Sequence, residues 1–316
     1  MSRIHEALKR AEEERAAQQT TVAAVAPVGE QPPVLVLPAV DELELAAAPS
    51  AAAVEEAGAG ALTLSLLTAR CARPAWKPDP RQVLFLDPQV HTAPGAEEFR
   101  TLRSRLYRIR EKQPLKTLLV GSAVPGEGKS FVSSNLAQMM ARQRGRRILL
   151  IDGDLRRSSL HHFLGALASP GLLDYLRGNA DEFAIVQQSP MEGLFFISAG
   201  TAAENPAEFL NNGRLKMLIQ RLEPVFDWII MDSPPVVPVS DASLMSEVCD
   251  GVVLVVKAAS TPCEVAQKAR DEFKGRPLLG VVLNGVESSS KYGSYYYYHG
   301  GYAESTKHRE GKRAKH

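Results

Sequence analysis

Residues 123–130, with the sequence AVPGEGKS, place the strongest constraint on how this chain can fold. They match the phosphate-binding pattern of a small residue, four spacers and Gly-Lys-Ser. A strand-like run from Leu115 to Val120 precedes them, and a helix-like run from Phe131 to Arg142 follows. A glycine-rich turn before a helix is the alternative interpretation. The flanking strand and helix favour a phosphate-binding loop within an α/β fold.

The residue types of the loop suit this chemistry. Gly126 and Gly128 allow backbone N–H groups to close around phosphate oxygens, and the helix that follows directs its positive end at them. Lys129 is expected on the β- and γ-phosphates, and the Ser130 hydroxyl on Mg²⁺. The predicted nucleotide-binding residues of this segment are Pro125, Gly126, Glu127, Gly128, Lys129, Ser130 and Phe131.

After the loop, short apolar runs alternate with helix-like stretches. The runs are continuous, which is typical of strands buried on both faces of a parallel sheet. We therefore predict an α/β fold with a doubly wound, mostly parallel sheet. The expected strands are Arg147 to Ile151, Leu194 to Ser198, Trp228 to Met231, Gly251 to Val256 and Leu279 to Leu283, with helices over Asn205 to Leu222 and Pro262 to Phe273.

Three aspartates come directly after predicted strands. Asp152 and Asp154 follow one strand, and Asp232 follows another. Each aspartate alone is as well explained as a turn residue or helix cap. Ligands of open α/β sheets bind at the carboxyl ends of strands, where carboxylates can hold Mg²⁺. We expect Asp232 to assist the metal, and of Asp152 and Asp154 one could hold the metal while the other accepts a hydroxyl proton.

The composition limits the partners of the protein. A net charge of +1 gives no overall attraction to nucleic acid. The three cysteines have no CxxC or metal-ligand spacing, and no apolar run reaches the roughly 18 residues that span a bilayer. Because the N-terminus is polar and does not resemble a secretory signal, we expect the protein in the cytoplasm.

Four regions differ in composition. Residues 1–17 predict an amphipathic helix, which could dock on a partner or equally be a solvated tail. Residues 18–81 are rich in Ala and Pro and predict a disordered linker. Residues 82–288, which begin near the strand-like run Val83 to Leu86, carry the α/β domain, and residues 289–316 form a basic, tyrosine-rich tail.

A helix is predicted from Ala96 to Arg110. One face carries Phe99, Leu102, Leu106 and Ile109 and should pack on the domain. Another face carries Glu97, Arg100 and Arg103, which could pair across a subunit boundary. By spacing alone, a solvated charged face is the more frequent explanation of such a triplet.

Together these features resemble the bacterial tyrosine autokinases of capsule and exopolysaccharide biosynthesis, over about Val83 to Val286. The main motifs are AVPGEGKS at 123–130, LIDGDLR at 150–156, DWIIMDSPP at 227–235 and the Glu-x-x-Arg-x-x-Arg of Glu97, Arg100 and Arg103. Further landmarks are Gly200, NPAE at 205–208, SDA at 240–242 and VLN at 282–284. The second motif continues as Arg157-Ser158-Ser159, where the family usually has Arg-Pro.

This resemblance implies a P-loop NTPase with a Walker A motif, a second acidic Walker A-like motif and a Walker B motif. It implies ATP and Mg²⁺ as cofactors and Asn284 as a contact to the adenine. The implied catalytic residues are Lys129, Asp152, Asp154 and Asp232, and Ser130, Asp152 and Asp232 would lie at the metal. Glu97, Arg100 and Arg103 would form the subunit contact of a ring-shaped homo-oligomer.

The resemblance also implies partners. Many family members carry two membrane helices and a periplasmic domain, which this sequence lacks, so it resembles the split form. A separate transmembrane activator of the chain-length-determinant type would hold such a kinase at the cytoplasmic face of the inner membrane, and a cognate tyrosine phosphatase would oppose it. The opening residues, MSRIHEALKRAE, resemble kinases associated with exosortase-linked loci.

Six of the eight tyrosines lie in the tail. A sticky aromatic tail or an interfacial anchor would explain the cluster without catalysis. The family resemblance instead implies that the cluster is the kinase's own substrate, phosphorylated in trans. The implied sites are Tyr292, Tyr295, Tyr296, Tyr297, Tyr298 and Tyr302.

Two other functions fit the same motifs. An ATPase switch of the cell-division or plasmid-partition type shares the fold. Such ATPases resemble each other in a second lysine, five positions before the lysine of Gly-Lys, where this chain has Val124. The second alternative is a catalytically silent, nucleotide-binding scaffold of a membrane polysaccharide complex, against which the retention of Lys129 and the three aspartates argues.

Overall fold

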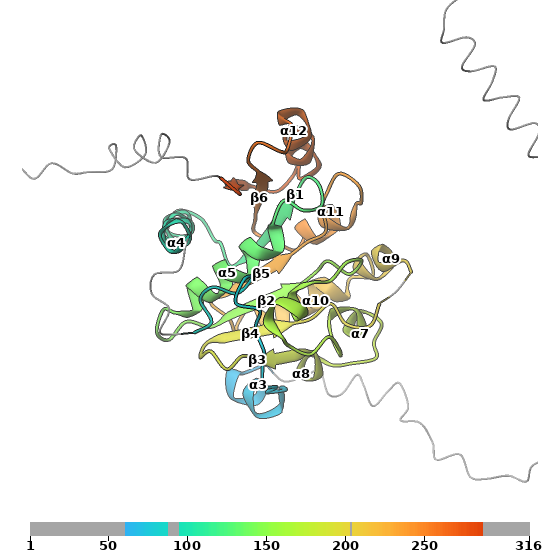
Figure 1. Cartoon of the computed structure of the whole chain (residues 1–316). Helices are drawn as coiled ribbons and strands as arrows, with labels where there is room; N and C mark the ends of the chain where they lie inside the picture. Colours follow the sequence, from blue (N-terminus) through green and yellow to red (C-terminus); the bar gives the residue numbers. More distant parts are fainter. Residues whose placement is uncertain (1–60, 88–94, 203, 287–316) are drawn as a thin grey trace, which may run out of the picture. The chain divides into compact units, whose positions relative to one another are not determined.

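The computed structural model describes residues 61–87, 95–202 and 204–286, and its centre is a seven-stranded sheet (Figure 1). The strand order is β3-β4-β2-β5-β1-β6-β7. Only β3 runs antiparallel to its neighbour, and the remaining pairs are parallel, which confirms the predicted doubly wound sheet. The strands are β1 (Thr117–Ser122), β2 (Ile148–Asp152), β3 (Val186–Gln188), β4 (Leu194–Ile197), β5 (Trp228–Asp232), β6 (Gly251–Lys257) and β7 (Leu278–Asn284).

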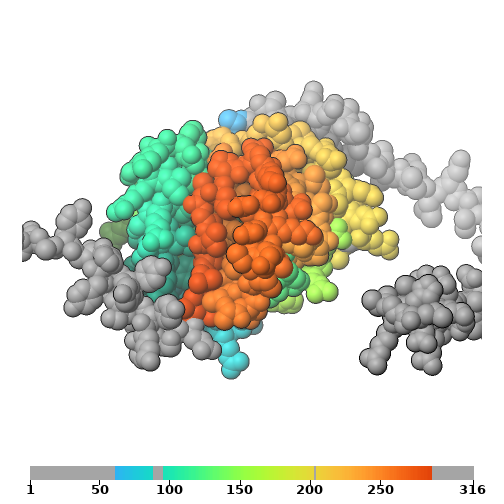
Figure 2. Space-filling view, turned by 90° about the horizontal axis from the view of Figure 1, so that it is seen from above, coloured from blue at the N-terminus to red at the C-terminus, as the bar shows by residue number. Residues whose placement is uncertain are grey.

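Helices cover both faces of the sheet (Figure 1). On one face lie α4 (Ala96–Arg110), α5 (Lys129–Ala141) and α6 (Leu160–Leu164). The other face is covered by α3 (Leu64–Arg70), α7 (Leu172–Leu176), α8 (Glu182–Ile185), α9 (Pro206–Leu210), α10 (Arg214–Leu222), α11 (Asp241–Ser246) and α12 (Cys263–Glu272). In the space-filling view, α4 and the segment with β7 and α12 form neighbouring regions of one surface (Figure 2).

The continuous apolar runs of β1, β2, β4, β5 and β6 follow from this double cover. The prediction of burial on both faces is wrong for β7, because it lies at the edge of the sheet and leaves Val281 and Leu283 exposed. In β1, Leu118 and Val120 pack into the core under α4 and α5, while Leu119 packs into the opposite core, and all three are fully buried. Burial of each such side chain contributes about 1.5–3 kcal/mol. A strand whose sequence alternated apolar and polar residues could pack against only one of the two cores.

The predicted helix over Asn205 to Leu222 is two helices. They are separated by Gly213, whose φ of 79° is left-handed and ends a right-handed helix at little cost. Asn212 holds the junction: its Oδ1 accepts from the Arg214 N–H at 2.9 Å, and its amide donates to the Leu176 carbonyl at 3.0 Å. The local side-chain bonds therefore replace the helical bonds at this point.

The strand-like run Val83 to Leu86 does not join the sheet. The N–H groups of Leu84 and Phe85 donate to the side chains of Asn135 and Gln138 on α5, at 2.8 and 2.9 Å. Because these amides satisfy the backbone, the segment is pinned along a helix and has no partner strand. Val83 and Phe85 are nevertheless buried, and Leu84 and Leu86 are partly buried against the same core.

The folded part of the chain also begins earlier than expected. The sequence places a linker up to residue 81, but α3 lies within it, and Leu67 is fully buried. Trp76 packs edge to face on Phe196, with ring centroids 6.0 Å apart. Residues 1–17, most of the linker and the tail from 289 lie outside the described residues. In the part that is described, no helix is long and apolar enough to cross a bilayer.

Asp227 joins two strands at the end of the sheet remote from the phosphate loop. Its Oδ2 accepts from the Arg147 N–H at 2.8 Å, and its Oδ1 accepts from Arg146 Nη1 at 3.1 Å. Burial alone would raise the pKa of Asp227, but the Arg147 N–H and the two guanidinium groups outweigh it, and the pKa lies below its usual value. The ionised carboxylate therefore stabilises the fold.

We predict that Asp227→Asn lowers the free energy of unfolding at pH 7 by about 1–3 kcal/mol, because charge-assisted hydrogen bonds are lost. The depressed pKa means that the wild-type advantage is present above the unfolded pKa of about 3.9 and is lost as the pH falls through the folded pKa. Urea unfolding at pH 7 and pH 3 measures both values. Asp271→Asn, at an exposed carboxylate that pairs with Arg270 and Lys274, serves as the control and should have a much smaller effect because water screens these pairs. An equal loss for Asp227→Asn at both pH values would contradict this assignment.

Candidate active site

The phosphate loop connects β1 to α5 and depends on two glycines. Gly126 and Gly128 have φ values of 82° and 91°, in the left-handed region that favours glycine. At Gly128 a Cβ would also lie 2.0 Å from Asn284 Nδ2, on β7. The loop can therefore adopt this path only with glycine at its last turn, directly before the N-terminus of α5.

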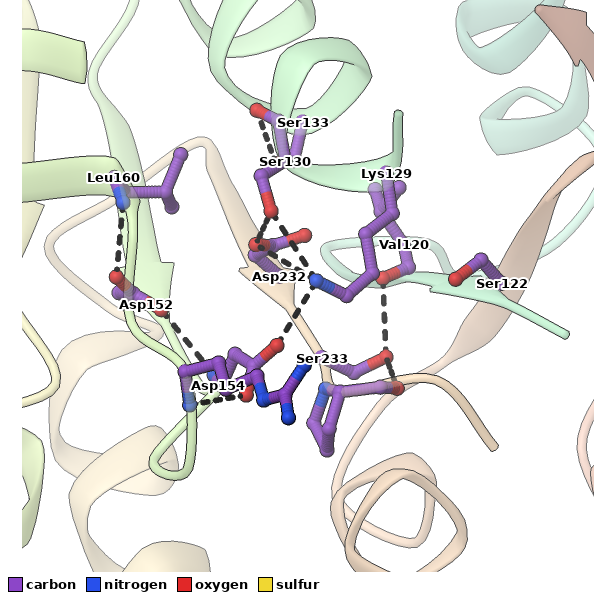
Figure 3. Close-up of polar contacts among 12 residues, drawn as sticks. Val120, Ser122, Lys129, Ser130, Ser133, Asp152, Asp154, Leu160, Asp232 and Ser233 are labelled. Carbon is purple, nitrogen blue, oxygen red and sulfur yellow. Dashed lines mark hydrogen bonds and ion pairs between the residues drawn. The ribbon is translucent and has the colours of Figure 1, made fainter. Parts of the chain in front are cut away.

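The ammonium group of Lys129 lies among acidic groups from two strand ends (Figure 3). Its Nζ is 3.0 Å from Asp154 Oδ2 and 4.0 Å from Asp232 Oδ2. The same Nζ donates to Ser130 Oγ at 3.2 Å, and Ser130 Oγ donates to Asp232 Oδ2 at 2.6 Å. The structure thus brings together Lys129, Ser130, Asp154 and Asp232, which were selected from sequence.

The sheet explains why these groups meet. β5 lies between β1 and β2, and Asp152 is paired in register with Asp232. Both aspartates are fully buried. Parallel strands end at the same edge of a sheet, so acidic residues at their carboxyl ends converge on the loop after β1.

Burial and mutual repulsion change the titration of these groups. Burial and the neighbouring Asp232 raise the pKa of Asp152 to about 8. Burial also raises the pKa of Asp232, partly offset by Lys129 and by the hydrogen bond from Ser130. Burial opposes the charge of Lys129, but Asp232 and Asp154 outweigh it and raise the Lys129 pKa. The cluster holds three carboxyl groups and one ammonium, an arrangement that favours a further cation.

Asp152 and Asp154 have different surroundings. Asp152 accepts backbone N–H groups from Asp154 and Leu160, both at 3.2 Å (Figure 3). Asp152 does not line the cavity beside the phosphate loop. Asp154 accepts the Arg157 N–H at 2.9 Å, pairs with Lys129, and lines that cavity. Of the two carboxylates, only Asp154 faces the space that a ligand could enter.

This cavity has a volume of about 560 Å³ and lies beside the phosphate loop. The predicted residues Pro125, Gly126, Gly128, Lys129, Ser130 and Phe131 line it. Asp154, also selected from sequence, lines it too, but the sequence analysis assigned no ligand-binding role to Arg156, Phe163, Pro234 and Pro235, which form part of the remaining wall. Arg156 is fixed by two bonds to Asp241, Nε to Oδ2 at 2.7 Å and Nη2 to Oδ1 at 3.0 Å. The position of Arg156, two residues after Asp154, is the sequence feature from which its place at the site could have been predicted.

Glu127 within the loop and Asn284 beside it do not line the cavity. The Glu127 carboxylate is buried and accepts from the Val124 N–H at 2.7 Å and from Thr261 Oγ1 at 2.5 Å. The Asn284 amide donates to the Glu127 carbonyl at 2.9 Å. These contacts tie the loop to the segments after β6 and in β7. Contact of Asn284 with an adenine stays a prediction.

The donor set fits a magnesium ion bound together with phosphates. Asp232 Oδ1 is buried and accepts no hydrogen bond, which leaves a carboxylate oxygen available next to Ser130. Among the described residues, no group of three or more His, Cys, Asp or Glu side chains could hold a metal ion. Mg²⁺ usually takes one or two carboxylates and completes its shell with phosphate oxygens and water. Ser130 and Asp232 would therefore hold the ion, with Asp152 behind them.

The charged triplet of α4 makes contacts within the chain. Arg100 pairs with Glu97 on the same helix, and Arg103 Nη1 donates to the Met139 carbonyl of α5 at 3.0 Å. The apolar face of α4 packs on the domain as predicted, with Phe99 and Leu106 buried. The subunit contact of this triplet stays a prediction, and the six tail tyrosines lie outside the described residues.

Comparison with known proteins gives consistent relatives. Residues 114–311 match the model of a ParA family described as the NUBPL iron-transfer P-loop NTPase. The tyrosine-protein kinase YwqD of Bacillus subtilis is 35% identical over 65% of this chain and 86% of its own length. The tyrosine-protein kinase CpsD of Streptococcus agalactiae is 34% identical over 67% of this chain and 93% of its own.

A longer relative and a solved structure are also tyrosine kinases by name. The putative tyrosine-protein kinase EpsB of Ralstonia solanacearum is 34% identical over 72% of this chain, which spans only 31% of that protein. The kinase domain of the Escherichia coli tyrosine kinase ETK has a TM-score of 0.63 at 29% identity, covering 69% of this chain and 85% of that structure.

We predict that Gly128→Ala weakens nucleotide binding by about tenfold or more, because the strained loop and the displaced Asn284 no longer present the N–H groups correctly. Gly145→Ala is the matched control: its φ is 75°, but a Cβ there meets no atom within 4 Å and it lies outside the loop. Fluorescent-nucleotide titration measures affinity, and thermal unfolding reports the backbone strain common to both. Equal affinities of the two variants would contradict the role of Gly128.

Proposed function

Because this chain belongs to the bacterial tyrosine-protein kinases, we propose that it is an autokinase that transfers the γ-phosphate of ATP to tyrosines in its own tail. The observation that carries the proposal is the contact network of Lys129 with Ser130, Asp154 and Asp232 beside a ligand-sized cavity. The cluster of six tyrosines between residues 292 and 302 supplies the acceptor.

The chain's own residues divide the work of phosphoryl transfer. The loop N–H groups and Lys129 would bind the phosphates and stabilise charge that develops on the transferred group. In the reaction a bond forms between a tyrosine oxygen and the γ-phosphorus, and the bond from that phosphorus to the bridging oxygen of ADP breaks. Asp154 would accept the phenolic proton, since it is the acidic side chain that faces the cavity. Magnesium, held by Ser130 and Asp232, would supply positive charge to the phosphates.

We assign phosphorylation in trans, from one subunit to the tail of a neighbour. Glu97, Arg100 and Arg103 would contribute to the contact between subunits of a ring. By the same reasoning, the kinase would work with a separate transmembrane activator at the cytoplasmic face of the inner membrane and with a tyrosine phosphatase. Repeated phosphorylation and release would regulate the polymerisation and export of a capsule or exopolysaccharide, a setting supported by the Cps and Eps names of relatives.

The purified full chain with ATP and Mg²⁺ tests the chemistry, with and without the cytoplasmic segment of a candidate activator. We expect phosphotyrosine at Tyr292 to Tyr302 by mass spectrometry, and a loss of at least about 100-fold in Lys129→Met. Asp154→Asn should slow the reaction by about 100- to 10,000-fold without abolishing ATP binding. Lys274→Met, at an exposed lysine, is the matched control and should react like the wild type.

A separate experiment tests whether phosphate is transferred between subunits. A chain with all six tail tyrosines replaced by Phe provides the catalyst, and the Lys129→Met chain provides the acceptor tail. Phosphotyrosine on the Lys129→Met chain supports transfer between subunits. ATP hydrolysis without phosphotyrosine would instead identify a partition-type ATPase switch, and nucleotide binding without turnover would identify a scaffold.

A further inference from the structure

A second, larger cavity lies at the C-terminal end of α5, with a volume of about 1150 Å³. Its walls come from α3, α4, the turn between α5 and β2, and the turn between β3 and β4. It shares no lining residue with the cavity at the phosphate loop. The 13 residues of α5 separate the two, a distance of about 20 Å at 1.5 Å per residue. It is therefore a separate site.

Arginine dominates the lining of this cavity, which we call the arginine groove. Its arginines are Arg100, Arg103, Arg142, Arg144, Arg146 and Arg147, and Glu192 is the acidic residue among the lining side chains. Two carboxylates outside the lining also bind these arginines: Glu97 pairs with Arg100, and Asp227 pairs with Arg146 and Arg147. Asp87 acts electrostatically on Arg142 as well, so six guanidinium groups face four carboxylates, and the groove keeps a positive surplus.

Arg144 is the clearest candidate to bind a ligand. It is exposed, and within the described part of the chain its side chain makes no ion pair or hydrogen bond. Arg103 uses Nη1 to hold the Met139 carbonyl, which fixes its guanidinium at the wall. Apolar side chains such as Leu64, Met191 and Phe195 also line the groove. The chemistry suits a ligand with both an anionic group and an aromatic ring.

We propose that the arginine groove binds phosphotyrosines in the tail of a second copy of this chain. This inference rests on the proposed autokinase function, which would create such residues. Arginine binds phosphate through paired N–H donors, and clusters of arginine are a recurring way to recognise phosphorylated peptides. The apolar side chains would receive the tyrosine ring.

Charge makes this recognition dependent on the modification. Residues 291–316 contain six Lys or Arg and two Asp or Glu side chains, so the unmodified tail is basic and is repelled by the groove. Each phosphate adds about −1.5 to −2 charges at neutral pH, and three phosphates reverse the sign of the tail. The groove would therefore bind the product of the reaction and not its substrate.

The concave shape favours a peptide over a membrane surface. A bilayer is flat on this scale and could not enter a cavity between α3 and α4, whereas a phosphotyrosine side chain could. Arg100 and Arg103 also belong to the predicted subunit contact. A phosphorylated tail in the groove would therefore compete with that direct contact.

The experiment uses the full chain with Lys129→Met, so that its own tail stays unmodified, and a synthetic peptide of residues 289–303. The peptide carries phosphotyrosine at Tyr295 and Tyr297, no phosphate, or phosphoserine at the same two positions. Fluorescence anisotropy should give about tenfold or greater preference for the phosphotyrosine peptide over the unmodified one, and a smaller affinity for the phosphoserine peptide.

Two matched charge reversals locate the binding site. Arg144→Glu should lower the affinity for the phosphotyrosine peptide by about tenfold or more, and Arg144→Gln should lower it by less. Arg105→Glu should leave this affinity unchanged, because Arg105 is an exposed arginine on α4 that lies outside the groove. Circular dichroism checks that each variant is folded, and the milder Arg144→Gln keeps the test decisive if Arg144→Glu unfolds.

Three outcomes overturn the proposal. They are equal binding of modified and unmodified peptides, equal losses in Arg144→Glu and Arg105→Glu, and loss of binding to phosphatidylserine vesicles in Arg144→Glu while peptide binding persists. The last would assign the groove to a membrane. Because the peptides are synthetic, their binding does not depend on kinase activity, and a failure of the autokinase proposal is recognised separately by absent tail phosphorylation.

Discussion

The ion pair between Lys129 and Asp154, with Asp232 and Ser130 beside it, is the interaction on which the site depends. Acidic groups converge there because β2 and β5 end together beside the loop that follows β1, and burial removes the water that would separate them. The protein tolerates this because Lys129 balances part of the charge. A site that carries excess buried carboxylate and an unpartnered Asp232 oxygen is suited to bind a cation and the phosphates that accompany it.

A single helix connects the two functional regions that we propose. Its N-terminus begins at Lys129 in the phosphate loop, and its C-terminal end contributes Met139 to the arginine groove. Midway, Asn135 and Gln138 hold the segment at residues 84–85 through side-chain hydrogen bonds. Chemistry and product recognition would thus lie at opposite ends of one rigid element, so that a tail could be bound at one end without blocking the other.

Much of the fold was predictable because its signals are local. Continuous apolar runs marked β1, β2, β4, β5, β6 and β7, and the aspartates that follow β2 and end β5 marked the site. The segment Val83 to Leu86 was misassigned because its hydrogen-bond partners are side chains of a distant helix. The three-residue strand β3 was missed because so short an edge strand carries almost no periodic signal.

The sequence by itself determined the phosphate loop, the residue types of the site and the class of the fold, since each rests on neighbours in the chain. Tertiary structure decided the rest. It turned Asp154 toward the cavity and left Asp152 behind it, and it aimed Arg103 at Met139. It also assembled the arginine groove from segments around residues 64, 103, 144 and 191, because only packing brings side chains so far apart in the chain to one surface.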